Sequence, residues 1–347
     1  MDMEKKEKEQ AEVVPTLEWY FWLAKWRIQL FGRQWNFFDV ASVIVVSVLH
    51  CLALLAPFHF NWGAVWVAMA LNSISGVGIT LSYHRNLAHK SFKLPKWLEY
   101  FFAIARFWDF RCIVATTCIN GSPLEWVSTH RNHHQFTDTW SDPHSPIAKG
   151  LWFSHIGWVF DYRSRFGSYE GRLNNVGDLK KQPYYIFLHY TYPFHSVALG
   201  VLLYVVGGLP FLVWGMGVRM VYMFHVTFSI NSICHTWGTQ VWDTDMSVGF
   251  GWKTIISNLD GLFGLLAHGE GWHNNHHAFD YSARQGLEWW QIDTTWYLIR
   301  FLQALGLAAE VKLPTEAQKK RKALCNKVIN KKEKLGTVGN NGKLQAT

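Results

Sequence analysis

Residues 273 to 277 read His273-Asn274-Asn275-His276-His277, with histidines at positions i, i+3 and i+4. On an α-helix, residues three and four positions later lie about 60° to one side and about 40° to the other side of the first residue. Three imidazoles with this spacing therefore share one helix face. The same spacing recurs at His130-Arg131-Asn132-His133-His134, and His84 and His89 form a looser pair.

The composition favours a membrane protein. The 347 residues are 49% hydrophobic, 16% aromatic and only 17% charged, yet the mean hydropathy is −0.01, so very apolar segments must alternate with polar ones. Residues 34–84 contain no Lys or Arg, and 182–252 contain only Arg219, although the net charge is +8. This asymmetry is typical of membrane proteins with basic segments on the cytoplasmic side. A nucleic-acid binder would not need such long charge-free runs, so no nucleic-acid partner is expected.

Four apolar runs predict four transmembrane helices, at about 40–57, 62–83, 187–214 and 220–242. The first run is uncharged and would reach roughly 27 Å as a helix, enough to cross a bilayer. A short uncharged link joins the first two runs, so they should form a helical hairpin, and Arg219 lies in the tight link between the last two. Four spans place both termini, and all three histidine clusters, on one side of the membrane.

The chain divides into an N-terminal segment (1–38), one main domain (39–313) and a basic tail (314–347). The N-terminal segment is expected to lie against headgroups, because Trp19, Trp22 and Trp26 stand beside Lys25 and Arg27; a core-packing helix is the alternative. The tail has few large apolar residues and is predicted to be disordered. Residues 253–267 are interpreted as an amphipathic helix.

The targeting and cysteine patterns exclude some classes of protein. The first residues mix acids and bases without Ser or Arg enrichment, which is unlike a transit peptide and favours the endoplasmic reticulum membrane over a plastid membrane. The five cysteines are scattered, without a CxxC pair, so neither a disulfide framework nor a zinc knuckle is predicted. His50 and His59 are interpreted as packing or interfacial residues and not as ligands.

The clustered histidines predict a metal site. Neutral imidazole binds Fe, Zn and Cu well, and many imidazoles packed together without a metal would leave polar nitrogens without partners. Eight imidazoles exceed what one ion accepts. His84 and His89 lie about 140° apart on an ideal helix, which predicts either two metals or a helix that ends there. The HExxH motif of zinc proteases is absent, and a redox pair at a membrane surface suits iron and dioxygen. A histidine-rich surface or a pH sensor is the non-metal alternative.

The three clusters resemble the three histidine boxes of membrane fatty acyl desaturases of the stearoyl-CoA type. The flanking residues are still more similar to the plant delta-9 acyl-lipid and acyl-CoA desaturases. The resemblance covers about residues 33–316, and the flanking stretches that carry it are Ser82-Tyr83, Trp126-Val127-Ser128-Thr129 and Ser282-Ala283-Arg284-Gln285-Gly286-Leu287-Glu288-Trp289-Trp290-Gln291.

The resemblance implies an all-α membrane protein, with four transmembrane helices and a cytosolic helical cap that holds two Fe²⁺ ions. Matched to the family pattern, the histidine ligands are His84, His89, His130, His133, His134, His273, His276 and His277, joined by His235 from an Asn-x-x-x-His motif. Asn231 of the same motif would reach iron through a water, and the i, i+4 spacing places both on one helix face. Trp126 matches a residue that lines the family's substrate tunnel, although plain aromatic packing also explains it.

The implied reaction uses O₂ as co-substrate and introduces a cis double bond, at carbon 9 or carbon 7, into a saturated acyl-CoA or acyl lipid in the bilayer. The chain has no His-Pro-Gly-Gly motif of a fused cytochrome b5 domain. The resemblance therefore implies a separate cytochrome b5 and its reductase as electron donors, or ferredoxin if the protein is plastidial. A diiron fatty acyl hydroxylase is an alternative on the same scaffold.

One segment departs from the family pattern. Residues 104–120 are longer than the corresponding family segment and place Arg106, Asp109 and Arg111 where an apolar stretch is usual, and Asn120 stands where Gln is usual. This is either a real insertion or an error in the gene model. It raises a third hypothesis, in which the protein binds metal or lipid but is catalytically impaired.

Overall fold

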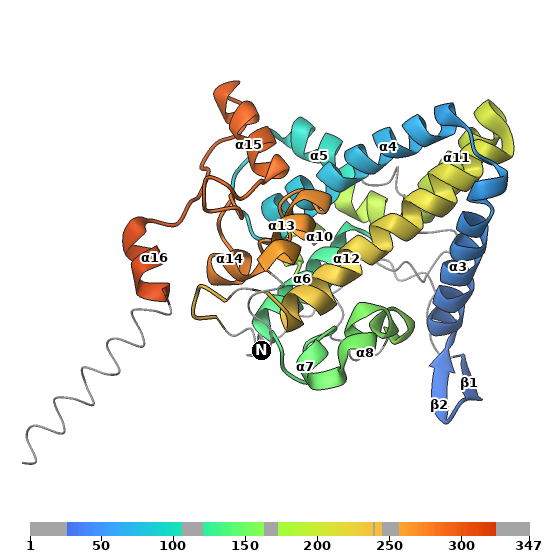
Figure 1. Cartoon of the computed structure of the whole chain (residues 1–347), viewed down its shortest axis with the longest axis horizontal. Coiled ribbons are helices and arrows are strands. Elements are labelled where there is room, and N and C mark those ends of the chain that lie inside the picture. Colours follow the sequence, from blue (N-terminus) through green and yellow to red (C-terminus); the bar gives the residue numbers. More distant parts are fainter. Residues whose placement is uncertain (1–25, 106–120, 163–172, 239, 245–256, 324–347) are drawn as a thin grey trace, which may run out of the picture.

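The computed structural model describes residues 26–105, 121–162, 173–238, 240–244 and 257–323 (Figure 1). These residues are mostly helical, in agreement with the predicted fold class. The predicted insertion at 104–120 and the aromatic residues of 1–25 fall almost entirely outside the described residues.

A β-hairpin precedes the first long helix and was not predicted for an all-α protein. Its strands β1 (Arg27–Leu30) and β2 (Arg33–Asn36) pair in antiparallel fashion. Phe31 and Gly32 both have positive φ, 51° and 72°, as a two-residue turn that matches the strand twist requires. The turn lies in the N-terminal segment, which the aromatic residues predict to be interfacial. The prediction of an all-α chain is wrong for this hairpin.

Two asparagines start the first two long helices. At α3 (Phe37–Leu54), the Asn36 side chain accepts a hydrogen bond from Asp39 N at 2.8 Å, and Asp39 accepts one from Asn36 N at 3.1 Å. At α4 (Trp62–Val77), Asn61 accepts from Ala64 N at 3.0 Å. The 3₁₀ turn η1 (Ala56–Phe58) joins them.

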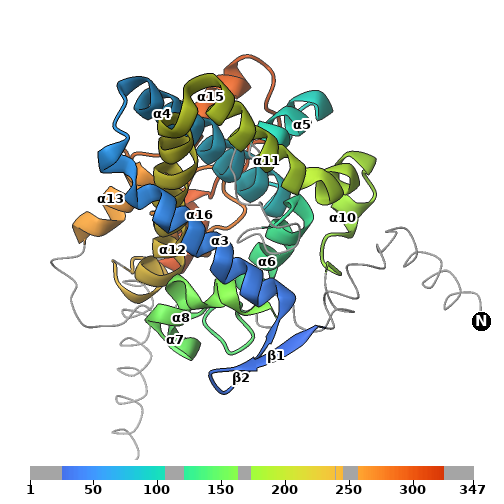
Figure 2. The ribbon, with the colours of Figure 1, turned by 90° about the vertical axis from the view of Figure 1, so that its right-hand side faces the viewer.

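The expected side-by-side hairpin of these two helices does not form. Figure 1 shows α3 diverging from α4, and both pack against the π-helix η6 (Val213–Val218) and α12 (Arg219–Thr236). In the turned view α3 lies in front of α12 (Figure 2). Gly217 allows η6 to approach α3 closely, because a Cβ atom at this position would lie 2.8 Å from Ala53 N.

Among the described residues, three helical runs are long and apolar enough to cross a membrane: Phe37–Phe58, Trp62–Ala88 and Phe194–Thr236. The third run has 43 residues, and an unbroken helix of that length would be about 65 Å long, twice the thickness of the hydrocarbon core. It is broken at Gly208 of α11 (Pro183–Leu212), where φ is 65° and ψ is −158°. Leu203 packs on Gly215 beyond this break, so the two arms fold back on each other.

The predicted link at Arg219 is therefore wrong. The helix continues through Arg219, which is buried and donates from Nε to Gly215 O (2.7 Å) and from Nη1 to Ser75 Oγ (3.2 Å). The chain turns at Gly208 instead, since glycine adopts positive φ without steric cost. A charged residue between two apolar runs predicts a loop, but the hydrogen bonds of Arg219 allow it to lie inside the helical bundle.

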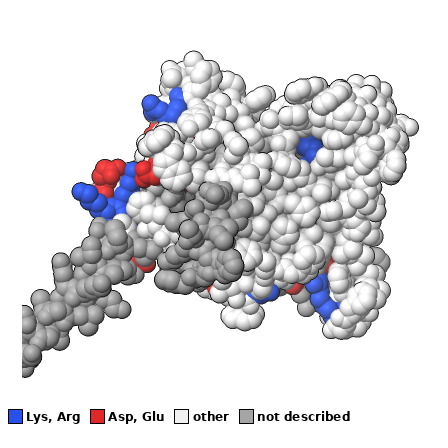
Figure 3. All heavy atoms as spheres, in the orientation of Figure 1, with Lys and Arg blue, Asp and Glu red and all other residues white. Residues whose placement is uncertain are grey.

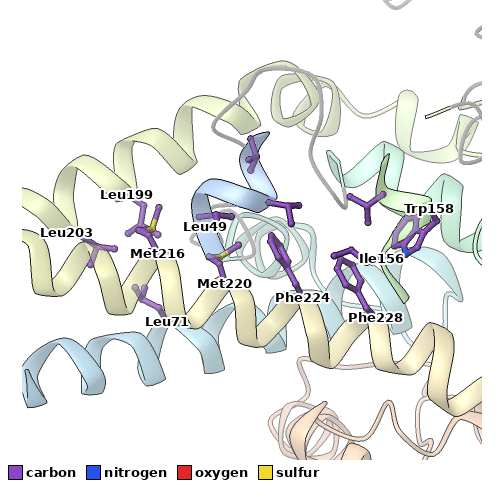
Figure 4. Close-up of a cluster of buried hydrophobic side chains, with 13 residues drawn as sticks. Leu49, Leu71, Ile156, Trp158, Leu199, Leu203, Met216, Met220, Phe224 and Phe228 are labelled. Atoms are coloured by element: carbon purple, nitrogen blue, oxygen red, sulfur yellow. The ribbon is translucent and has the colours of Figure 1, made fainter. Parts of the chain in front are cut away.

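The largest apolar core joins α3, α4, α11 and α12 to the short helices α8 (Leu151–His155) and η4 (Gly157–Phe160) (Figure 4). Phe224 and Phe228 stack along α12 with ring centroids 5.8 Å apart. Figure 3 shows that the surface over the long helices carries almost no charge, whereas Lys, Arg, Asp and Glu gather at its margins. The long helices also expose large apolar side chains such as Trp66, Phe194 and Val205, and an uncharged, apolar surface of this kind indicates membrane association.

Gly217→Ala is expected to destabilise the protein by about 1–3 kcal/mol, because the added methyl group meets the backbone of α3 and neither helix can retreat without strain. Thermal unfolding in detergent measures the effect. Gly177→Ala is the matched control, since a Cβ atom there meets nothing within 4 Å. Equal melting temperatures for the two variants would contradict the described packing of η6 on α3.

The remaining described helices form a compact region beside the bundle of long helices. They are η2 (Gly78–Ala88), α5 (Lys96–Ala105), α6 (Pro123–Gln135), α7 (Pro146–Lys149), α10 (Gly177–Lys180), α13 (Ser257–Leu266), α14 (His273–Ala278), α15 (Thr294–Ala304) and α16 (Glu316–Lys322). The helix predicted at 253–267 is found as α13, with 253–256 outside the described residues.

The prediction of a disordered tail is wrong as far as Ala323. Thr315 and Gln318 form a capping box that starts α16. Lys322 Nζ then donates to Ala278 O at 2.7 Å, and Ala323 forms a β-bridge with Trp242. These contacts give the polar segment a partner that its composition does not reveal. Residues 324–347 lie outside the described residues.

Candidate metal centre

Nine histidine side chains converge between the long helices and the compact region. Their ligand nitrogens form two groups, each within 4.8 Å, one from His84, His89, His130, His134 and His276, and the other from His133, His235, His273 and His277. The structure thus brings together all nine histidines singled out in the sequence. Whether they bind metal is a separate question, which their geometry and surroundings address.

The second and third histidine boxes each contribute to both groups, whereas His84 and His89 of the first box both join the first group. In α6, His130 and His134 join the first group and His133 joins the second. In α14 the division is reversed, because His276 joins the first group while His273 and His277 join the second. The i, i+4 pair of each helix therefore shares one group, and the residue between them faces the other.

A π-helix brings His84 and His89 into the same group. They lie at the end of η2, and His89 N donates to His84 O at 3.1 Å, an i+5 hydrogen bond. In such a helix, a residue and the one five positions later lie near the same face, whereas an α-helix would place them about 140° apart. The helix does end there, with His89 as its C-cap, as one of the two predicted alternatives has it, and its π-helical geometry brings both rings into one group.

The histidines meet through their Nε2 atoms. His276 Nε2 lies 3.0 Å from His84 Nε2 and 2.8 Å from His134 Nε2, and His89 and His130 approach to 2.8 Å. In the second group, His273 Nε2 lies 2.9 Å from His235 Nε2 and 3.1 Å from His277 Nε2. A neutral imidazole has one N–H, so convergence of several Nε2 atoms leaves lone pairs facing each other. A cation at the centre of each group would resolve this, and the donor set fits a metal.

The surroundings keep the imidazoles neutral. Burial, followed by repulsion from neighbouring histidines, lowers the pKa of six of them well below 6.5; the six are His89, His130, His134, His273, His276 and His277. Neutral imidazole is the form that binds a metal ion, since a protonated ring has no free lone pair. The site is therefore prepared for cations at neutral pH.

Buried carboxylates hold the outer nitrogens of three histidines. Glu270 makes a short contact with His84 Nδ1. Asp142 lies 3.0 Å from His133 Nδ1, and Asp138 lies 3.3 Å from His235 Nδ1. Metal-bound histidines commonly have such a carboxylate partner, which fixes the ring orientation and the tautomer. The histidine pattern does not predict these carboxylates, although Glu270 lies three residues before the third box and the aspartates lie in a turn-rich stretch after the second.

Arg85 secures one of these carboxylates. Its guanidinium lies 3.0 Å from Glu270 Oε1 and 2.9 Å from Asp293 Oδ2, and it also donates to Ala283 O at 2.8 Å. Asp293 in turn accepts from Gln285 N at 2.8 Å. Gln285 Nε2 approaches the Nδ1 atoms of His84 and His276 at 3.4 and 3.3 Å. A buried polar network thus supports the first group from behind.

An apolar cavity opens beside both groups. Trp126 and Asn231 both line it, together with His84, His130 and His273. The Trp126 ring stacks on His130, with centroids 4.9 Å apart and planes 15° apart. Asn231 lies one helical turn before His235, as its motif predicts. Its role as a water-mediated ligand stays a prediction.

Two other histidines behave differently. His50 contacts His225 at 3.1 Å and stands apart from both groups, in keeping with its interpretation as a packing residue. His144, which was not singled out, forms a further grouping with His133 and Asp142. Burial lowers the pKa of His144 to about 3. Since its Nδ1 is 3.7 Å from Asp142, it adds to the polar shell around His133.

Asp142→Asn is expected to weaken metal binding at the second group by about 10–100-fold, the usual effect of losing an outer partner of a ligating histidine. The amide keeps the shape of the side chain but not its charge. Titration of the metal-free protein with Fe²⁺ measures the change. Asp280→Asn is the control, because Asp280 is half exposed and 3.9 Å from His89. An unchanged affinity in Asp142→Asn would show that Asp142 does not orient His133.

Comparison with known proteins places these features in context. The family described as "Fatty acid desaturase" matches residues 60–308. A palmitoyl-monogalactosyldiacylglycerol delta-7 desaturase of Arabidopsis thaliana is 54% identical over 301 residues, 86% of this chain and 76% of the relative. An icosanoyl-CoA 5-desaturase of Limnanthes douglasii is 54% identical over 83% of this chain and 76% of the relative. Delta-9 acyl-lipid desaturase 2 of Arabidopsis thaliana is 49% identical over 88% of this chain and 90% of the relative.

Proposed function

Because the chain belongs to the fatty acid desaturase family, whose members are oxidoreductases acting on acyl-CoA or acyl lipids, we propose that it introduces a cis double bond at carbon 9 or carbon 7 of a saturated acyl chain. The acyl chain is carried by coenzyme A or by a glycerolipid. The observation that supports this proposal most strongly is the pair of buried histidine groups beside one apolar cavity.

The proposed cofactors are two iron ions, with one held by each histidine group. Asn231 would reach the second ion through a water. When bound, the ions supply the activation of O₂ that allows hydrogen to be removed from an unactivated methylene. The protein holds the rings in place through Glu270, Asp142 and Asp138. The orientation of the imidazole rings is then fixed before the substrate binds, so little free energy is needed to reorganise the site during the reaction.

The apolar cavity would select the methylene that reacts. Its wall includes the aliphatic side chains of Ile79, Val226 and Ile230, which offer no hydrogen bond to water, and the aromatic ring of Trp126. A chain held against this wall presents only a few carbons to the histidine groups, and such positioning can supply a large part of a rate enhancement. Because Trp126 stacks on His130, the wall is continuous with the first group.

The proposed location is the endoplasmic reticulum membrane. The proposed number of spans is four, because Gly208 divides the 43-residue run into two arms. The histidine groups and the compact helical region would then form a cytosolic cap. The proposed electron donors are cytochrome b5 and its reductase. A plastid membrane, with ferredoxin as donor, is the alternative, and the delta-7 relative is named as chloroplastic.

Expression in yeast that lacks its own delta-9 desaturase tests the proposal. A new monounsaturated fatty acid is expected, and the position of its double bond distinguishes carbon 9, carbon 7 and the carbon 5 named for one relative. A hydroxylated fatty acid would favour the hydroxylase. No product from iron-loaded protein in the membrane would count against desaturation. Activity restored by deleting residues 104–120 would support the hypothesis of a catalytically impaired homologue.

A further inference from the structure

His268 lines the same apolar cavity as the histidine groups. The cavity follows α12 from Asn231 to Met223, a distance of about 12 Å along the helix. On α4 it reaches Gly76, two turns before His84. His268, from the loop between α13 and α14, lines the cavity at this level, and a Cβ atom on Gly76 would lie only 2.5 Å from His268 Nε2. The imidazole is therefore seated directly on the α4 backbone.

The backbone of His268 is strained in a way that fixes this position. Its φ of 57° lies in the left-handed region, which residues other than glycine seldom adopt. The strain is held from several sides, because Thr295 N donates to His268 O at 3.2 Å and His268 Nδ1 lies 3.1 Å from Thr294 Oγ1. Strained residues cluster at binding and catalytic sites, where the surrounding structure maintains them.

The ring can serve as a wall for an apolar group. Burial lowers the pKa of His268 below 6.5, so the imidazole is neutral at pH 7. The neighbouring lining residues Ile79, Met223 and Leu266 are apolar. Neither Gly76 behind the ring nor Thr294 beside it allows the ring to retreat freely. An acyl chain whose reactive carbons lie at the histidine groups would thus meet His268 with its methyl end.

We propose that His268, seated on Gly76, is the end wall of the acyl cavity and limits how many carbons of the substrate lie beyond the reactive methylenes. This inference rests on the proposed desaturase function, and it names the residue that sets chain length in this protein. A longer tail would have to displace a ring held by Gly76 and Thr294. A shorter tail would leave part of the apolar cavity unfilled.

Substitutions at both sides of the contact test the proposal in yeast, with the ratio of long to short monounsaturated products as the readout. His268→Ala removes the wall and is expected to favour longer chains by roughly fourfold for each additional buried methylene. His268→Leu keeps most of the volume and should retain the parent ratio. Gly76→Ala pushes the ring into the cavity and should shift the ratio toward shorter chains.

An unchanged ratio in active His268→Ala would overturn the proposal, and so would a long-chain shift of equal size in His268→Leu. Thermal shifts of purified protein with palmitoyl-CoA and icosanoyl-CoA, without an electron donor, give a readout that does not require turnover. His268→Ala should raise the stabilisation by icosanoyl-CoA relative to palmitoyl-CoA, and an unaltered order would contradict the inference. Absence of any monoene from the unaltered protein would instead count against the proposed function.

Discussion

His276→Ala is expected to abolish monoene formation and to reduce the bound iron below two ions per chain. His276 is almost fully buried, and its Nε2 lies within 3.0 Å of both His84 Nε2 and His134 Nε2. Its removal deletes the ligand that links α14 to the first group. Loss of an outer partner of a ligand alone typically costs 10–100-fold, so loss of the ligand itself should lower activity by more than about 100-fold.

Iron content per chain and monoene formation per amount of membrane protein should be measured together. His59→Ala is the matched control, because His59 lies in the link between α3 and α4, away from both groups. It should retain both iron and activity. If His276→Ala kept two tightly bound ions and normal turnover, the assignment of the first group as an iron site would have to be abandoned.

Arg85→Met should destabilise the protein by about 3–5 kcal/mol, the usual effect of breaking a buried ion pair by removing one partner. Arg85 is 1% exposed, and its guanidinium contacts both Glu270 and Asp293. Methionine fills most of the volume but leaves two buried carboxylates near each other without a cation. Glu270 would also lose the contact that holds it toward His84, so iron binding should weaken along with stability.

Thermal unfolding in detergent and the amount of protein recovered from membranes report this effect. Lys93→Met is the control, because Lys93 and Glu310 form an exposed pair at 2.6 Å, and such pairs contribute about 0–1 kcal/mol. A similar melting temperature for the two variants would mean that Arg85 is not a structural support of the first histidine group.

The nine histidines of the site could be predicted because chemistry restricts their spacing. Imidazoles at i, i+3 and i+4 in two separate helices point to a shared ligand, and the family pattern added His235. What sequence could not show is how the second and third boxes divide between the two groups, since that depends on the angle at which α6 and α14 meet. The supporting carboxylates were missed for a similar reason, because Asp138 and Asp142 reach the site only after the turn that follows α6 has folded.

The apolar runs were easier to predict than the turns between them. Hydropathy identified the long helices, but it placed a link at Arg219, where the structure has a continuous helix and a buried guanidinium. The turn at Gly208 depends on backbone freedom that hydropathy does not register. Likewise, the i+5 hydrogen bond that aligns His84 and His89 is a property of η2, and regular α-helical geometry gives the wrong answer there.

The division of the second and third boxes between the two groups has a consequence for assembly. Any rotation of α6 moves His130 and His134 together with His133, and α14 couples its own three rings in the same way. Occupancy of one iron position would thus pre-align donors of its neighbour, so iron uptake by the apoprotein should be cooperative, with a Hill coefficient above one. A protein with a single ion would be a short-lived intermediate and not a stable half-loaded state.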